Sequence, residues 1–352
     1  MNAIIVFIIA FTVSSICIPL VIKLAIKKRI LGVYGEGRHV HKGFVPRLGG
    51  MAIFIGFILS QLYFSIDYFS ASSISESYLL LIFSIILLFI LGLIDDLVDL
   101  KAFLKLNIQI LVAFILVWKA DIRVESFHGI LGIKTLPIYL SYLFSILVIT
   151  FFINAYNLID GLDSLSSSVG IYGLGCFTWF FILNDCHIES MLAFSSMGSL
   201  FGFWLYNKPP AKIFMGDSGS LSIGLLLAFF AIRISNLPLD TEGSINPVFA
   251  MVVLAYPVID TLRVFIIRIY NGKSPFSPDR NHIHHVLLDL GLSHGKSTIL
   301  IVLFSLFFSV IAFVLRMNLN LSFIVLVLLM LFASQTPSYL LRKKNERKIN
   351  SL

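Results

Sequence analysis

Residues 78–99 read YLLLIFSIILLFILGLIDDLVD. This stretch decides the fold, because no charged side chain occurs between positions 78 and 94, and Asp95, Asp96 and Asp99 follow directly. A helix needs about 20 apolar residues to cross the hydrocarbon of a bilayer. The run therefore predicts a membrane-spanning helix, and the aspartates mark the end at which that helix leaves the membrane.

The whole chain has a composition similar to that of this stretch. Hydrophobic residues make up 58% of its 352 positions and charged residues 13%, which is about half the charged share of a soluble domain. The mean hydropathy is +0.95. These values exclude a soluble globular domain, a disordered chain and a single-pass protein with a large soluble head. We predict an all-α, polytopic integral membrane protein with a single domain over residues 1–352.

Apolar runs along the chain predict about eleven transmembrane helices. The expected spans are 3–25, 48–66, 78–94, 104–119, 137–155, 165–183, 189–206, 219–235, 247–270, 298–316 and 321–341. In the longest outer loop, about 120–136, alternating residues and two glycines predict a small hairpin.

The distribution of positive charge predicts which side of the membrane each loop faces. Eighteen Lys and Arg residues fall on one set of loops and the C-terminal tail, counting Lys105 at the start of a span, and four fall on the other side, counting Lys119 and Arg316 at the ends of spans. Basic residues collect on cytoplasmic loops, so we expect the N-terminus outside and the C-terminus in the cytoplasm, with a basic tail at 342–352. The same rule accounts for the net charge of +7 without a nucleic-acid partner.

Carboxylates gather on this predicted cytoplasmic side, where membrane topology alone gives no reason for them. Six of these carboxylates lie close to the ends of predicted spans, and all six are aspartates: Asp95, Asp96, Asp99, Asp160, Asp163 and Asp217. Six carboxylates at one depth repel one another unless a cation or hydrogen-bond donors compensate. Oxygen ligands of this kind suit Mg²⁺, with Mn²⁺ as the alternative. Solvated helix ends are the other reading of the pattern.

Two motifs place these aspartates in polar surroundings. Asn154, Asn157 and Asp160 recur every three residues and would stack on one side of a helix end. The sequence Gly-Asp-Ser-Gly-Ser at 216–220 opens an apolar run, so backbone amides, hydroxyls and a carboxylate would meet at a helix N-terminus. That arrangement favours a metal-bridged phosphate. Ordinary helix capping is the simpler alternative for each motif.

Two basic motifs complete the set. The segment 277–285 reads SPDRNHIHH, in which Arg280 and the imidazoles are suited to donate hydrogen bonds to a diphosphate. A zinc site is less favoured there, because no cysteine accompanies the histidines. The first cytoplasmic loop carries His41 and Arg47 ahead of Gly49 and Gly50, and it would bring phosphate toward the site. Asp260 and Arg263, inside a span, could form a structural ion pair or belong to a site.

Together, these five motifs resemble the polyprenyl-phosphate N-acetylhexosamine-1-phosphate transferase family, and most closely its bacterial undecaprenyl-phosphate GlcNAc-1-phosphate transferases. The resemblance covers nearly the whole chain, with the motifs in the family's order, and the ordered set is far more specific than any single motif. One part departs from the family. Val33-Tyr34-Gly35 and Arg38-His39 stand where its members usually have Asp-x-Pro ahead of an Arg-Lys pair.

The resemblance implies an enzyme that transfers a sugar-1-phosphate from a UDP-N-acetylhexosamine, with UDP-GlcNAc expected, to undecaprenyl phosphate and releases UMP. It implies catalytic roles for Asp95, Asp96 and Asp160, and a Mg²⁺ ion ligated by Asp217. It further implies substrate contacts from Asn157, Asp163, Phe214, Arg280, His282, His284, His285, Arg47 and His41. The enzyme would lie in the bacterial inner membrane with its active site on the cytoplasmic face, and a homodimer is left open.

Other functions also fit part of the pattern. The same reaction could use another UDP-N-acetylhexosamine or UDP-MurNAc-pentapeptide. A secondary transporter would also place ionisable side chains in membrane helices. Transport predicts such groups near the middle of the bilayer and an internal repeat, whereas here they crowd one face and the sequence shows no clear repeat.

Overall fold

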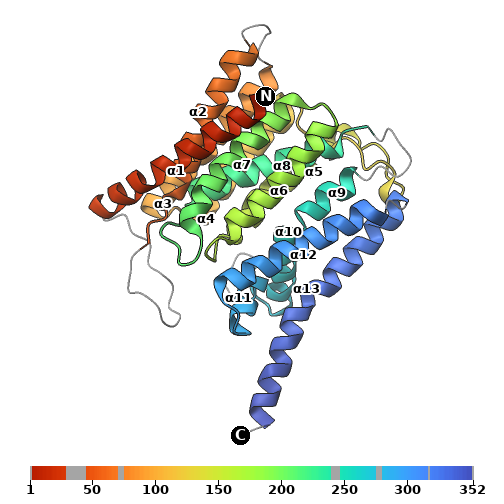
Figure 1. Cartoon of the computed structure of the whole chain (residues 1–352). Coiled ribbons are helices and arrows are strands. Elements are labelled where there is room, and N and C mark those ends of the chain that lie inside the picture. Colours follow the sequence, from red (N-terminus) through yellow and green to blue (C-terminus); the bar gives the residue numbers. More distant parts are fainter. Residues whose placement is uncertain are drawn as a thin grey trace. The chain divides into compact units, whose positions relative to one another are not determined.

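The computed structural model describes residues 2–28, 45–69, 75–238, 246–274, 280–315 and 318–350. Within these ranges the long elements are all helices (Figure 1), which confirms the predicted all-α class. One antiparallel bridge joins Ser126 to Thr135 beside the short helix η1 (Ile130–Gly132), in the loop where a hairpin is predicted.

Each predicted span corresponds to helix, and the bounds differ by a few residues except at the C-terminus. The helices are α1 (Asn2–Lys28), α2 (Gly49–Phe69), α3 (Glu76–Val98), α4 (Ala102–Lys119), α5 (Ile138–Leu158), α6 (Leu165–Leu183), α7 (His187–Asn207), α8 (Gly216–Ser235), α9 (Asn246–Val253), α10 (Ala255–Tyr270), α11 (Ile283–Asp289), α12 (His294–Leu315) and α13 (Leu319–Asn350). Much of the predicted basic tail is therefore the last part of α13.

Fewer helices qualify as membrane spans than the eleven predicted. Among the described residues, nine helices are long and apolar enough to cross a membrane, and α9 and α10 make a tenth span if the pair, bent by 72°, counts as one. Helix α7 is not among them, although it has 21 residues. Its serines lower its hydropathy, and one of them, Ser195, accepts hydrogen bonds from Ser60 and Gln61 of α2. The predicted orientation of the termini stays a prediction.

The chain divides into two compact units. The first contains Met1–Glu125 and Pro137–Ile234, and in it α7 packs on α1, α2 and α6, while α4 packs on α3 and α5. The second contains Ser126–Leu136 and Ser235–Leu352, and in it α12 packs on α9 and α13, while α11 packs on α12 and α13.

Helix α8 is the most deeply enclosed of the candidate spans in the first unit, with 89% of its apolar window buried. Glycines let its N-terminal turn approach two neighbours backbone to backbone. A Cβ atom on Gly50 of α2 would lie 2.2 Å from the amide nitrogen of Gly219, and one on Gly92 of α3 would lie 2.4 Å from the amide nitrogen of Ser218. Only glycine fits at these two contacts, so they fix where α8 begins.

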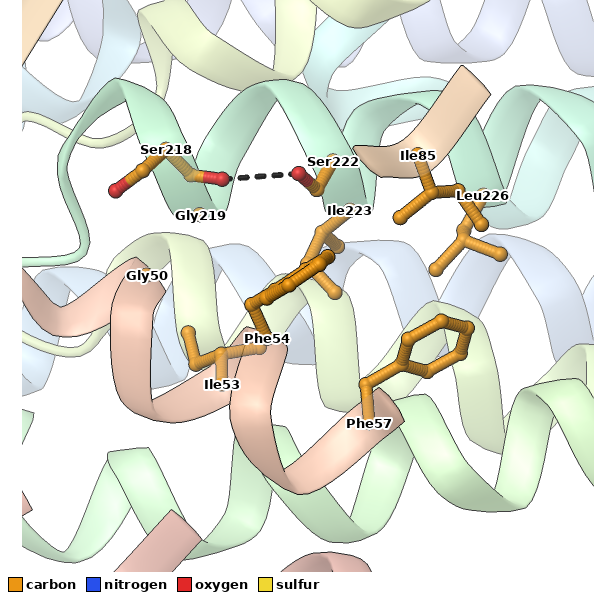
Figure 2. Close-up of a pocket in the computed structure, with 10 residues that line it drawn as sticks. All are labelled: Gly50, Ile53, Phe54, Phe57, Ile85, Ser218, Gly219, Ser222, Ile223 and Leu226. Atoms are coloured by element: carbon orange, nitrogen blue, oxygen red, sulfur yellow. Dashed lines mark hydrogen bonds between the residues drawn. The ribbon is translucent and has the colours of Figure 1, made fainter. Parts of the chain in front are cut away.

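Figure 2 shows the same region from the side of a small, mostly apolar pocket between α2, α3 and α8. Gly50 and Gly219 line one end of it, and Phe57 and Leu226 line it further along. The hydroxyl of Ser222 donates to the carbonyl oxygen of Ser218, 2.9 Å away, within α8. Apolar packing therefore begins in the same turn of α8 that carries the polar motif.

Replacing Gly92 with alanine tests this close approach. The added methyl group meets backbone atoms of α8 that cannot rotate away, so we expect Gly92→Ala to destabilise the protein by about 1–3 kcal/mol. Thermal unfolding in detergent measures the effect. The matched control is Gly175→Ala in α6, where the nearest atom to the new Cβ lies 3.8 Å away and helix propensity favours alanine. Equal melting temperatures for the two variants would contradict the contact.

Candidate active site

A carboxylate from another helix holds the first turn of α8. The backbone amide of Asp217 donates to Oδ1 of Asp96 at 2.8 Å, and the amide of Ser218 donates to Oδ2 at 3.0 Å. The Ser218 hydroxyl also donates to Oδ2, at 2.7 Å. The first amides of a helix have no partner within it, and the helix dipole favours negative charge at that end. Asp96, on α3, therefore caps α8 across the helix interface.

A second carboxylate completes this capping. Asp160 accepts the Gly216 amide at Oδ2, 3.2 Å away, and the Ser166 hydroxyl at Oδ1, 2.5 Å away. Gly216 has φ +73°, and a Cβ atom there would lie 2.1 Å from the carbonyl oxygen of Arg47. The turn therefore requires glycine for its conformation and for its space. The backbone amides predicted to bind phosphate are thus occupied by protein carboxylates.

The environment of Asp160 shows that negative charge is crowded here. The pKa of the Asp160 carboxyl is raised to about 7, mainly by burial. The nearby charges of Asp217 and Asp96 add to this rise, and the hydrogen bonds from Ser166 and Gly216 oppose it. A carboxyl group in this position is stabilised as an anion by any cation that joins the cluster.

A lysine that the sequence analysis did not single out lies between two of the aspartates. Lys105 Nζ is 2.9 Å from Oδ2 of Asp95 and 2.8 Å from Oδ2 of Asp217. The other oxygen of Asp95 accepts the Leu100 amide at 2.8 Å. In the sequence, Lys105 resembles the basic residues that commonly flank a membrane span. The feature that sets it apart is its position one turn into an apolar helix, shortly after the aspartates of α3.

The predicted residues that follow α5 fix the loop before α8. Asp163 is buried and accepts the Ala211 amide at 3.1 Å. Asn207, which the sequence analysis missed, is buried too. Its side chain accepts the Ser164 amide at 3.0 Å and donates to the Ile213 carbonyl at 2.9 Å. A lone Asn at the end of a span carries no signal for such a role.

Three more of the residues predicted to contact substrate lie in or near the loop before α8. Asn157 is half-buried in the last turn of α5. Phe214 is also half-buried, and its amide donates to the Pro46 carbonyl at 2.8 Å, which joins the end of the first loop to the segment before α8. Arg47 follows on the exposed surface. His41 lies outside the described residues.

The histidine motif belongs to the second unit. Arg280 is exposed, 3.6 Å from Asp289. His282 and His284 are buried, and His285 is half-buried. Burial lowers the pKa of His284 to about 3, so its ring is neutral at pH 7 and can act on an anion only as a hydrogen-bond donor.

The donor set of the first unit fits a hard divalent cation. Among the residues that the structure describes, no three His, Cys, Asp or Glu side chains are grouped as a metal site. However, Mg²⁺ is commonly held by one or two carboxylates and completed by water and substrate phosphates. Asp95 and Asp217 already direct one oxygen each at a single cationic group, that of Lys105. With one lysine among four carboxylates, the cluster can accept further positive charge.

Comparison with known proteins identifies the family. The model of glycosyl transferase family 4 matches residues 78–235. A probable undecaprenyl-phosphate N-acetylglucosaminyl 1-phosphate transferase of Bacillus subtilis is 31% identical over 340 residues, which cover 94% of this chain and 91% of the relative. The chain belongs to glycosyl transferase family 4. This membership confirms the resemblance inferred from the motifs and the prediction of a transferase.

Two further relatives match at similar levels. A decaprenyl-phosphate N-acetylglucosaminephosphotransferase of Mycobacterium leprae is 32% identical over 293 residues, covering 77% of this chain and 73% of the relative. An undecaprenyl-phosphate alpha-N-acetylglucosaminyl 1-phosphate transferase of Salmonella typhi is 29% identical over 306 residues, covering 83% and 78%. The residues that the family model matches include the whole aspartate cluster and Lys105.

The capping by Asp96 can be tested through stability. We expect Asp96→Ala to destabilise the protein by about 1.5–3 kcal/mol, because hydrogen bonds to a charged group are lost and two helix amides are left without partners. Thermal unfolding in detergent checks this. Asp99→Asn is the control, since Asp99 is exposed with φ 54°, a conformation that asparagine also tolerates. A melting temperature for Asp96→Ala equal to that of the control would contradict the capping.

Proposed function

We propose that this chain transfers GlcNAc-1-phosphate from UDP-GlcNAc to undecaprenyl phosphate, which forms a lipid-linked diphosphate sugar and releases UMP. The names of its relatives, which match it over most of their lengths, support this reaction. The structural observation that carries the proposal is the convergence of Asp95, Asp217 and Lys105 at the N-terminus of α8, within the residues that the family model matches.

The chemistry of the reaction explains why such a centre suits it. A lipid phosphate is already an anion at neutral pH, so the enzyme need not generate a strong nucleophile. The barrier comes from bringing two phosphate groups together in line for displacement. Positive charge fixed at that point stabilises the charge that develops on the transferring group. Direct displacement and a covalent aspartyl intermediate would both use this arrangement.

Each part of the cluster has a proposed role. Asp217, with Asp95 beside it, would hold Mg²⁺, which when bound neutralises the diphosphate oxygens. Lys105 adds a second positive charge at the same place. Asp96 and Asp160 hold the backbone that carries Asp217, so their contribution to catalysis includes fixing its position.

The remaining predicted residues would bind the substrates. Asn157, Asp163 and Phe214 would line the pocket for the nucleotide and sugar phosphate. Arg280, His282, His284 and His285 would contact the diphosphate or the sugar, with His284 neutral. Arg47 and His41 would lie on the approach of phosphate. We place the site on the cytoplasmic face of the bacterial inner membrane, since the loops beside it carry most of the positive charge.

Transfer of label tests the proposed reaction. Purified protein in detergent receives undecaprenyl phosphate, Mg²⁺ and radiolabelled UDP-GlcNAc, and label entering the lipid phase is counted. We expect transfer that EDTA abolishes and that Asp217→Asn reduces at least about 100-fold. Asp99→Asn serves as the control for an exposed aspartate.

The donor is varied in the same assay. Transfer from another UDP-N-acetylhexosamine alone would keep the reaction and change the sugar. Folded protein that labels lipid from no UDP-sugar would refute the proposal.

The role of Lys105 gives a separate prediction. Lys105→Met keeps the length of the side chain and removes its charge, so we expect kcat/KM to fall about 10²–10³-fold, the loss typical for removing one group that stabilises the transition state. Lys101→Met, at the exposed N-cap of the same helix, should change it less than twofold. Steady-state kinetics measures both variants. Similar small effects from the two would show that Lys105 is only a helix-end charge.

A further inference from the structure

One buried carboxylate fastens the histidine motif to α10. Asp260 has no exposed surface. Its Oδ1 accepts the amide of Ile283, the first residue of α11, at 2.8 Å, and its Oδ2 lies 2.9 Å from Nδ1 of His282. An ionised carboxylate can only accept hydrogen bonds, so the hydrogen between them belongs to the histidine nitrogen.

An arginine lies beside this carboxylate. Arg263 Nη1 is 3.9 Å from Asp260 Oδ1 and donates to the carbonyl of Asn281 at 2.7 Å. The same guanidinium donates to the hydroxyl of Ser338 on α13. Arg263 and Asp260 thus compensate each other's charge, and both hold the residues on either side of His282. The sequence left open whether Asp260 and Arg263 form a structural ion pair or belong to a site. In the structure the two residues support the histidine motif.

The orientation of the His282 ring is fixed on a second side. It stacks on the ring of His284, with centroids 5.4 Å apart and an angle of 16° between the planes. His284 is held in turn through its Nδ1, 3.1 Å from the hydroxyl of Tyr256. With Nδ1 of His282 bound to Asp260, its Nε2 is the ring nitrogen that is left to meet a ligand.

We propose that Asp260 is a positioning residue: it holds the Nδ1–H of His282 and so presents the unprotonated Nε2, as a hydrogen-bond acceptor, to a hydroxyl group of the nucleotide sugar. The identity of the ligand rests on the proposed function. The orientation of the His282 ring and the position of its proton do not. A carboxylate behind a histidine sets both the orientation of the ring and the nitrogen that carries the proton.

Asparagine at position 260 separates this role from simple structural support. Its side-chain oxygen can still accept the Ile283 amide, so the link to α11 is kept. Its amide group would then face Nδ1 of His282 as a donor, and the ring would have to carry its proton on Nε2 instead. Asp260→Asn therefore reverses the tautomer with little change in shape.

Nitrogen NMR of the full-length protein labelled with ¹⁵N-histidine reads this tautomer directly. The signals of His282 are assigned by their loss in His282→Asn. We expect a protonated Nδ1 in the wild-type protein, and an unprotonated Nδ1 with a protonated Nε2 in Asp260→Asn. An unprotonated Nδ1 in the wild type, or signals unchanged by the substitution, would overturn the proposal whether or not the protein transfers sugar phosphate.

Kinetics then tests the consequence for substrate. We expect Asp260→Asn and His282→Asn each to lower kcat/KM for the UDP-sugar about 10–100-fold, as losses of supporting hydrogen bonds around ligating histidines do. Because Asp260 acts through His282, the double variant should be no worse than His282→Asn alone. Losses that multiply in the double variant would overturn the positioning role. A wild-type protein without transfer activity would refute the proposed function and leave the NMR result to decide the tautomer.

Thr261→Val is the matched control for both measurements. Thr261 is the next residue of α10 and is equally buried, and its hydroxyl has no hydrogen-bond partner in the described structure. We expect it to leave the His282 signals in place and kcat/KM within twofold. A loss as large as that of Asp260→Asn would show that any change in this part of α10 disturbs the site, and it would overturn the specific role of Asp260.

Discussion

The site depends on one interaction, the capping of α8 by the carboxylate of Asp96 from α3. It places an anion at the positive end of a buried helix and satisfies two amides that would otherwise lack partners. Gly92 and Gly50 allow the backbones to come close enough for it. The backbone amide of Asp217 is one of the two that Asp96 binds, so the position of Asp217 depends directly on this hydrogen bond.

The same interaction explains how a cluster of like charges remains stable at one end of a helix bundle. Two of the four aspartates are neutralised by backbone dipoles and hydroxyls, and the other two share Lys105. The arrangement still leaves more negative than positive charge, which adds to the rise that burial causes in the pKa of Asp160. A phosphoryl-transfer site needs such a balance, because it must gain positive charge together with its anionic substrates.

The sequence predicted the helices well and the site in part. Apolar runs located every long helix, because a span must be apolar wherever it contacts lipid. They also counted α7 as a span, although it is not among the helices apolar enough to cross a membrane, and they did not reveal the break between α9 and α10. The aspartates were recognisable because carboxylates at membrane helix ends are conspicuous. Lys105 and Asn207 were not, because their meaning lies in contacts with residues far along the chain.

The central claim is that Asp217, fixed by Asp96, directs a divalent cation to the diphosphate of a nucleotide sugar. A structure of the protein with UDP-GlcNAc and Mn²⁺, in which the anomalous signal of manganese locates the ion, tests it most directly. The account predicts manganese bound to the Asp217 carboxylate and to the diphosphate, with Asp96 still hydrogen-bonded to the first amides of α8. An ion bound elsewhere, or a nucleotide bound away from Asp217, would contradict it.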